Sequence, residues 1–86
     1  MVKQYIYTHS DGSKFYYKNP EMTIPHREDG PAVEWVSGNK EWIVNGEHHR
    51  LDGPALEYVN GDQLWLVNGE FIFETGRAGD IIGTLR

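Results

Sequence analysis

The chain of 86 residues contains the stretch HREDGPAVEW at residues 26–35, and this stretch returns as HRLDGPALEY at residues 49–58. Further identities continue in the same register, so the sequence repeats with a period of 23 residues. The identical positions include His26, Arg27, Asp29, Gly30, Pro31, Ala32, Glu34, Gly38, Trp42, Val44, Asn45 and Gly46, matched by residues 49, 50, 52, 53, 54, 55, 57, 61, 65, 67, 68 and 69. Self-similarity at a fixed spacing is the signature of a repeat architecture.

The repeat extends weakly toward both ends of the chain. Upstream, a shift of 26 residues aligns Gly12 with Gly38 and Tyr16 with Trp42. We therefore expect one domain, with a degenerate unit at residues 5–25, repeats at 26–48 and 49–71, and a C-terminal cap at 72–86. Degenerate terminal units are typical of repeat arrays, in which they serve as caps.

Each unit is predicted to form two short strands. Apolar and polar residues alternate in PAVEWV, KEWIVN and QLWLVN, as they do in half-buried strands. Asn-Gly occurs at residues 45–46 and 68–69, and SGN and NGD occupy residues 37–39 and 60–62. Asn-Gly between such runs is a strong hairpin signal because both residues tolerate positive φ. The prediction is an all-β fold, an antiparallel meander of β-hairpin repeats forming an open twisted sheet of about six or seven short strands.

The HR-x-DGPA block is predicted to be a structural corner between strands. Asp, Gly and Pro are turn residues, and Pro can begin a strand without a ladder donor. Arg27 can pair with Asp29 or Glu34, and the matching residues of the second unit can do the same. The residues assigned this structural role are His26, Arg27, Asp29, Gly30, Pro31, Asp52, Gly53 and Pro54.

The same block also contains residue types suited to acid–base catalysis, with His as a base and Arg as an anion clamp. A catalytic site needs one unique arrangement, whereas this block recurs once per unit, so we expect a structural role and no catalytic residue. His48 and His49 are adjacent, and neighbouring strand residues point to opposite faces, so no shared metal site is expected. No cofactor is predicted.

Aromatic side chains form the second recurring feature. Trp35, Trp42, Tyr58 and Trp65 are expected to stack in a row along one sheet face. They are also candidates for a binding platform together with His48, His49 and Arg50. Further apolar residues, Val36, Ile43, Val59, Leu64 and Leu66, are expected on the opposite face. Because one layer of sheet cannot bury both faces, either residues 71–86 fold back as a lid or a second chain provides cover.

Composition narrows the classes of partner. The formal charge is −5, with 13 acidic against 8 basic side chains, which disfavours nucleic-acid binding. There is no cysteine, as expected of a protein in a reducing cytoplasm. No apolar run has the length of a membrane span or signal peptide, so no membrane partner is expected. Open sheet edges favour a homodimer.

The unit, with its G-x-x-x-W-x-x-N-G core at residues 38–46, resembles the MORN repeat class and its YwqK-type variants. Its form W-x-V-N-G-E-x-H-R-x-D-G-P-A-x-E is similar to a repeat in small proteins of tailed bacteriophages and large DNA viruses. The resemblance covers roughly residues 5–73 and implies an open sheet of hairpins that contacts proteins or lipids. HR-x-DGPA replaces the Gly-rich second turn of true MORN units, and basic residues are few. The resemblance assigns no catalytic role.

These observations give a ranked set of functional hypotheses. The first is a non-enzymatic protein-interaction module, a small phage accessory protein that binds a host protein in the host cytoplasm, with inhibition of a defence protein as one outcome. The second is a sponge for a small molecule or nucleotide, with His48, His49, Arg50 and Trp residues in a cleft between subunits. The third is a hydrolase that uses His26 or His49. An acidic mimic of nucleic acid ranks fourth because the charge density is low.

Overall fold

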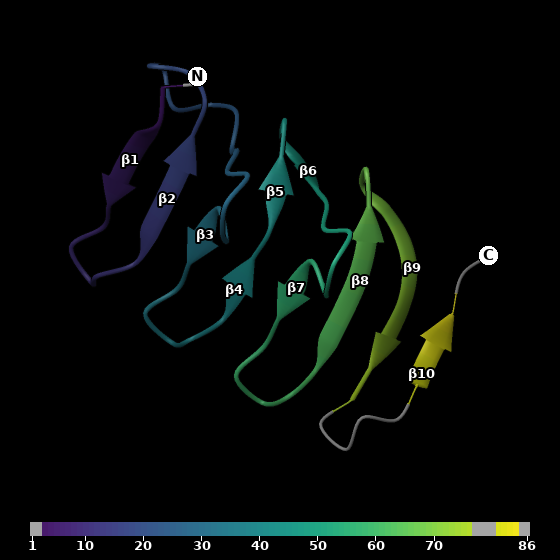
Figure 1. Ribbon diagram of the computed structural model, residues 1–86. Helices are drawn as coiled ribbons and strands as arrows, with labels where there is room; N and C mark the ends of the chain where they lie inside the picture. Colours follow the sequence, from purple (N-terminus) through teal and green to yellow (C-terminus); the bar gives the residue numbers. More distant parts are fainter. Residues whose placement is uncertain (1–2, 77–80, 85–86) are drawn as a thin grey trace.

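The computed structural model describes residues 3–76 and 81–84 of the chain, and this part is an antiparallel β-meander. The hairpin strands lie side by side in nearly sequential order (Figure 1). The larger sheet contains, in spatial order, β1 (Tyr5–Thr8), β2 (Lys14–Tyr17), β3 (Val33–Glu34), β4 (Lys40–Glu41), β7 (Leu56–Glu57), β8 (Gln63–Val67), β9 (Glu70–Thr75) and β10 (Ile81–Thr84). A separate pair is formed by β5 (Ile43–Val44) and β6 (Glu47–His48). The predicted all-β hairpin meander is confirmed.

The described strands are ten in number, more than the six or seven expected. The run at residues 40–44 divides at Trp42 into β4 and β5, and β5 pairs with β6 outside the main sheet. The break follows from the corner blocks, since the amide of Trp42 donates to Ala55 and its carbonyl accepts from His49. Trp42 is therefore bonded to both ends of the next corner.

The Asn-Gly turns adopt the conformation that their sequence predicts. Asn45 and Gly46 have φ of 53° and 82°, and Asn68 and Gly69 have φ of 51° and 80°. Positive φ at both central residues matches the right-handed twist of the flanking strands. These turns lie at one end of the sheet, and the tips of the longer hairpin turns lie at the other (Figure 1).

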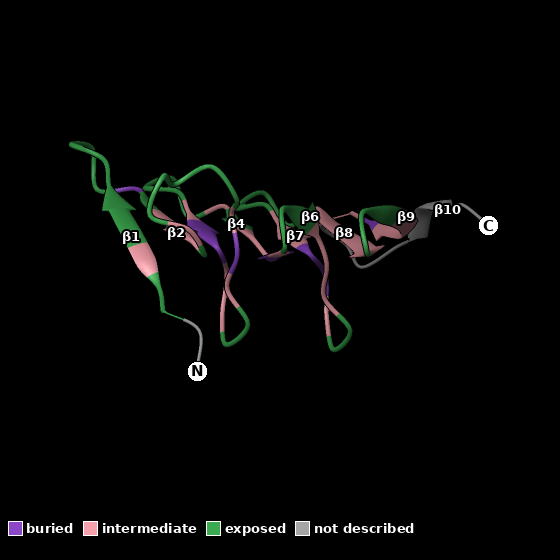
Figure 2. Cartoon of the chain, turned by 90° about the horizontal axis from the view of Figure 1, so that it is seen from above, coloured by how far each residue is buried: buried purple, intermediate pink, exposed green. Residues whose placement is uncertain are grey.

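The sheet is a single layer. The molecule measures 39 × 28 × 18 Å, and a view from above shows the strands in one curved row (Figure 2). Of the two alternatives for covering the sheet, a lid is not formed by the described part of residues 71–86. Strands β9 and β10 instead extend the sheet beyond β8, each paired with its neighbour. No described segment covers either face as a second layer.

The strand register divides the side chains between two faces. Val33 is opposite Glu41 and Glu34 is opposite Lys40, so Trp35 shares a face with Glu41 whereas Trp42 points to the other side. We name the face of Trp35, Glu41, Tyr58 and His48 the open face. We name the other face, which carries Tyr16, Trp42, Trp65 and the loops at 27–31 and 50–54, the corner face.

This division corrects the expected row of aromatic rings. Trp35 and Tyr58 lie on the open face, and Trp42 and Trp65 lie on the corner face. Ring contacts instead join Trp35 to Phe15 at 5.2 Å and Trp65 to Phe73 at 4.5 Å. The expectation fails because alternation within a strand does not reveal which residues face each other across a hairpin.

The core is correspondingly small. Its buried hydrophobic residues in the described part are Ala32, Val33, Ile43 and Ala55, and Phe15 packs against the cluster formed by the first three. On the corner face, charges of opposite sign face each other across neighbouring strands, as in the series Lys14, Glu34, Lys40 and Glu57. Such pairs leave little apolar area buried, and most large side chains remain partly exposed.

Candidate functional site

Each corner block holds its arginine in the same set of contacts. The Arg27 guanidinium lies 4.1 Å from the ring centroid of Tyr16, and that of Arg50 lies 3.9 Å from Trp42. Arg27 Nε donates to Asp29 at 3.0 Å, while its NH1 donates to the Pro31 carbonyl and to Glu34, both at 3.2 Å. Arg50 bonds Asp52, the Pro54 carbonyl and Glu57 in the same way. The arginine therefore ties the corner to the sheet.

The electrostatic balance at Arg27 agrees with this role. Burial alone lowers the pKa of the guanidinium, but the hydrogen bond to Asp29 and the charges of Tyr16, Asp29 and Glu34 outweigh it and raise the pKa. Stacking on an aromatic ring while donating to carboxylates is a geometry that arginine supports and lysine does not. The cation is thus paired with carboxylates of its own unit and stacked on a ring of the preceding unit.

The histidine that begins each corner block bonds the backbone of the following Asn-Gly turn. Nδ1 of His26 accepts the backbone N–H of Asn45 at 2.9 Å, and Nδ1 of His49 accepts that of Asn68 at the same distance. An accepting Nδ1 requires the tautomer with hydrogen on Nε2. His26, only 5% exposed, and His49 therefore use their basic nitrogen within the fold, which supports the structural interpretation of both residues.

A groove lies between the two corner loops on the corner face. Its volume is about 750 Å³, and the loops that flank it project from the sheet side by side (Figure 2). Trp42, Val44 and His49 contribute to its lining, and Leu51, 79% exposed, stands on one loop. Three carboxylates, Glu28, Asp29 and Asp52, line it together with only two guanidinium groups. The groove is therefore net acidic, and its arginines are already paired.

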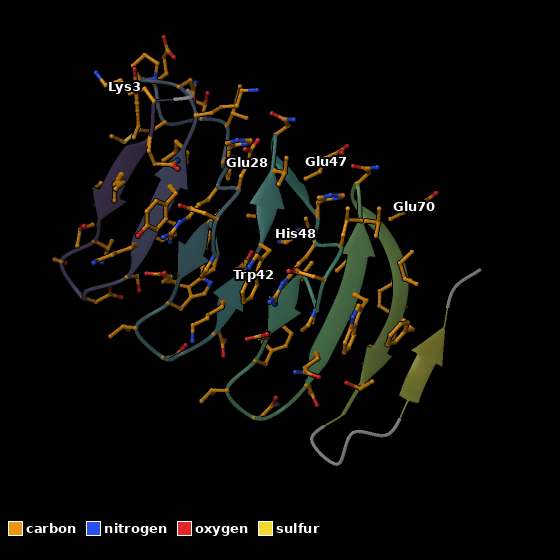
Figure 3. The ribbon with its side chains drawn as sticks, in the orientation of Figure 1. Lys3, Glu28, Trp42, Glu47, His48 and Glu70 are labelled. Atoms are coloured by element: carbon orange, nitrogen blue, oxygen red, sulfur yellow. The ribbon has the colours of Figure 1, made fainter. Side chains whose placement is uncertain are left out.

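A different polar cluster occupies the middle of the open face. The Glu41 carboxylate accepts the indole N–H of Trp35 at 2.7 Å and bonds Nε2 of His48 at 2.8 Å. The hydrogen bond from His48 lowers the pKa of Glu41, and the bond from Trp35 adds to this effect against the opposing effect of burial. Nδ1 of His48 forms no hydrogen bond within the described residues. His48 lies near the middle of the array (Figure 3), and the register that sets its partner Glu41 on the open face sets Trp42 on the other face.

Sequence reasoning did not single out Glu41, although a signal was present. One period later, the positions of Glu41 and His48 are occupied by Leu64 and Phe71. The pair therefore departs from the apolar pattern of the neighbouring unit, while the surrounding block is repeated. Where a repeat is otherwise maintained, a pair of matched departures indicates a local role for these two residues.

Exposed apolar residues gather at the tips of two successive hairpins. Trp35 is 40% and Val36 66% exposed, and their counterparts Tyr58 and Val59 are 38% and 72% exposed. The backbone N–H of Val36 donates to Ser13 Oγ, and that of Val59 donates to Asn39 Oδ1, so neighbouring tips are tied together. We name these four residues, Trp35, Val36, Tyr58 and Val59, the tip surface.

The structure thus separates the seven predicted binding residues into two groups. Trp42, Trp65, His49 and Arg50 are engaged in contacts within the corner face, through Arg50, Phe73, Asn68 and Glu57 respectively. Trp35, Tyr58 and His48 lie on the open face and remain partly exposed. His48 and His49 bond different partners, Glu41 and Asn68, and no cluster of metal-ligating residues occurs in the described part of the chain. No helix of that part is long and apolar enough to span a membrane.

Comparisons with protein-family models, with curated proteins and with solved structures gave no match.

Proposed function

We propose that the protein is a non-enzymatic module that binds another protein through its open face. The observation that carries this proposal is the tip surface, in which two successive units present an aromatic and a valine side chain to solvent. Neighbouring exposed apolar side chains of this kind mark interaction sites in soluble proteins. The tips are also held in place by the bonds to Ser13 and Asn39, so little ordering is needed on binding.

The composition of the open face fits a protein partner. Trp and Tyr are the residues most enriched at the energetic centres of protein interfaces. Trp35 is oriented by its bond to Glu41, and Glu41 is in turn held by His48, so the indole has a fixed position beside Phe15. The resemblance of the repeat to small proteins of tailed phages makes a bacterial host protein the partner class that we propose, with binding in the cytoplasm.

The groove on the corner face supports a second candidate, a small-molecule binder. Its volume is within the range of ligand sites, and it contains three of the residues predicted for that role, Trp42, His49 and Arg50. Its excess of carboxylates disfavours a nucleotide, because phosphate would be repelled and both arginines are already paired. A ligand for this groove would be neutral or cationic.

The hydrolase hypothesis receives less support from the geometry. A general base needs a free lone pair, and Nδ1 of both His26 and His49 already accepts a backbone N–H. His48 has an oriented ring, but it lies on the open face and does not line the groove. A substrate there would not be sheltered from water.

The test compares three tagged proteins incubated with bacterial lysate: the wild type, a Trp35→Ser and Tyr58→Ser double variant, and Leu51→Ser as the matched control. Among the residues whose burial is described, Leu51 is the most exposed large apolar side chain, and it lies on the corner face. We expect one protein retained in stoichiometric amount by the wild type and by Leu51→Ser and lost from the double variant.

Two results would count against the open face. Equal retention by all three proteins would show that the tip surface is not the contact, and loss with Leu51→Ser alone would favour the groove. The groove is checked separately by the melting temperature, since a ligand at 100 times its Kd adds about 2.7 kcal/mol to stability. Circular dichroism of all three proteins must show the same β-sheet spectrum.

A further inference from the structure

The sheet has two end strands, β1 and β10, and they differ in their suitability for pairing with another strand. Strand β1 has the sequence YIYT, without a charged residue, proline or glycine. Strand β10 contains Gly83, and its pairing with β9 shifts register between Ile81 and Gly83. Bulges, glycines and charges protect edges from pairing, and an edge without them is a template for it. Strand β1 is therefore the unprotected end of the sheet (Figure 1).

The register shows which backbone groups β1 presents at its free edge. Tyr16 directs its N–H to Ala32 and its carbonyl to His26, on the side away from β1. Ile6, opposite Tyr16, is therefore in a non-hydrogen-bonded pair, and its own N–H and C=O point outward. The same holds two residues later for Thr8. No described residue accepts from or donates to these outward backbone groups.

From this edge we propose that the protein forms a symmetric dimer in which β1 of two copies pair antiparallel. Of the registers that match outward groups with outward groups, we choose the one that sets Ile6 of each copy opposite Thr8 of the other, so that each pair exchanges both of its hydrogen bonds. Tyr7 of the two copies then meets at the dyad as a non-hydrogen-bonded pair. The two sheets become one continuous sheet with the same face on the same side, as an isologous contact requires.

The side chains around β1 agree with this register. On the open face, Trp35 contacts Phe15 at 5.2 Å and Phe15 contacts Tyr7 at 6.0 Å, so the aromatic series would continue across the dyad. Ile6 is 50% and Tyr7 46% exposed, and pairing would cover both. The same register sets Lys3 beside the turn that carries Asp11 of the second copy, a match of opposite charge at each end of the interface.

The mass in solution tests the dimer, using light scattering during gel filtration over a concentration series. We expect the wild type at about twice the 9.9 kDa of one chain. Ile6→Pro removes an outward N–H that the single chain does not use, and proline is tolerated at such an edge position, so this variant is expected at 9.9 kDa. Ile6→Thr, which keeps the N–H, is the matched control and is expected to remain a dimer.

A cross-linking experiment tests the register. Because the chain contains no cysteine, only the introduced residue can form a disulfide. Tyr7→Cys places two sulfurs at the dyad within reach of a disulfide, and we expect a covalent dimer on oxidation. Tyr5→Cys is the control, because the two Tyr5 positions are separated by roughly 13 Å along the paired strands. It is expected to remain monomeric under the same conditions.

The proposal is overturned by a wild type that stays at 9.9 kDa at every concentration, or by an Ile6→Pro variant that keeps both the fold and the dimer. It is likewise overturned by a disulfide that forms with Tyr5→Cys and not with Tyr7→Cys. If Ile6→Pro fails to fold, as judged by circular dichroism, the two cysteine variants decide alone. The inference does not depend on the proposed partner protein, since β1 and the tip surface are different surfaces.

Discussion

At the scale of single residues, the corner blocks are maintained by close packing of an arginine against a glycine. A Cβ added to Gly53 would lie 2.7 Å from Cζ of Arg50, and one added to Gly30 would lie 3.0 Å from Cζ of Arg27. An unrestrained guanidinium could move away from the added methyl group at little cost. That of Arg50, however, is stacked on Trp42 and hydrogen-bonded to three groups. The glycine in HR-x-DGPA is thus required by the arginine rather than by its own backbone angle.

This packing predicts the effect of Gly53→Ala. We expect a loss of about 1–3 kcal/mol, because the added methyl group must displace Arg50 from Trp42 and its oxygen partners. Urea denaturation measures it, and Gly30→Ala should cost less because its clearance is larger. In an Arg50→Ala background the penalty should nearly vanish. An equal penalty in both backgrounds would mean that the glycine acts through the backbone.

Glu41 is expected to make stability depend on acidity. The bond from His48 lowers its pKa below the ordinary value of 4.5 in the folded protein, so the carboxylate contributes stability above that value. The contribution is lost as the pH falls below 4.5 and through the lower folded pKa, because protonation then removes an acceptor from His48 and Trp35.

The measurement is the free energy of unfolding at several pH values from about 6 to 3, for the wild type and Glu41→Gln. The wild type should lose more stability than the variant in this range. Glu70→Gln, at the exposed first residue of β9, serves as the control and should follow the wild type (Figure 3). Parallel curves for the wild type and Glu41→Gln would contradict the assigned role.

At the scale of elements, the hairpins are joined by side chains that bond to the backbone of the next unit. Asn39 Oδ1 accepts the N–H of Val59 at 2.8 Å, and Ser13 Oγ accepts that of Val36 at 2.9 Å. At the opposite end of the sheet, the N–H of Gly46 donates to the Pro25 carbonyl and that of Gly69 donates to the His48 carbonyl, each in the preceding unit. Successive hairpins are therefore fastened at both ends, although their central strands β3, β4 and β7 are only two residues long.

Asn39→Ala is expected to loosen the second hairpin tip. It should cost about 1 kcal/mol and speed hydrogen exchange at the Val59 amide, which loses its acceptor. Asn39→Asp keeps an oxygen at the same position and should leave that amide protected. NMR-detected exchange measures both variants, and unchanged protection in Asn39→Ala would show that the bond does not hold the tip.

Local sequence was sufficient to predict the elements but not their mutual register. The Asn-Gly turns and the meander follow from local backbone preferences, because residues such as Asn45 and Gly46 readily adopt the positive φ of a tight hairpin turn. The sequence predicts Asp29 or Glu34 as the partner of Arg27, and in the structure Arg27 pairs with both. The faces of Trp35 and Trp42 were not predictable, because they depend on which residues pair across the turn at 37–39.

The candidate site was predicted less completely than the fold. The Glu41–His48 pair joins β4 of the main sheet to β6 of the separate pair, and its formation depends on the break at Trp42 that places β5 and β6 outside the main sheet. The position of the C-terminal segment is also not predictable from its sequence, because a strand paired with β8 and a lid across the sheet would bury similar residues. Both outcomes are set by tertiary contacts that composition does not specify.

At the scale of the whole molecule, stability is distributed along the array. Each unit contacts its neighbours through the same bonds, and no described second layer connects distant units. In such arrays, stability is approximately a sum of terms for units and for the interfaces between them. One unit can therefore be removed if the interfaces that remain are of the same kind.

Deletion of residues 26–48 tests this property of the array. The deletion joins Pro25 to His49, and the partners available to the second corner become those of the first. Arg50 would stack on Tyr16 as Arg27 does, and the Val59 amide would meet Ser13 as that of Val36 does. We expect a folded β-sheet protein with a cooperative transition and a melting temperature lower by on the order of 10 °C, because one set of interfaces is lost.

The control removes residues 26–37 only, which joins Pro25 to Gly38 and places no corner between β2 and β4. That chain is longer, yet it is expected to unfold, since Arg27 and its partners Asp29 and Glu34 are absent and the register of the following strand is shifted. Circular dichroism and thermal melting compare the two deletions. If the shorter chain unfolds, or if both deletions are equally tolerated, the array is not built from interchangeable units of 23 residues. If the shorter chain unfolds, the first candidate for the missing stability is the Glu41–His48 pair, which that deletion removes.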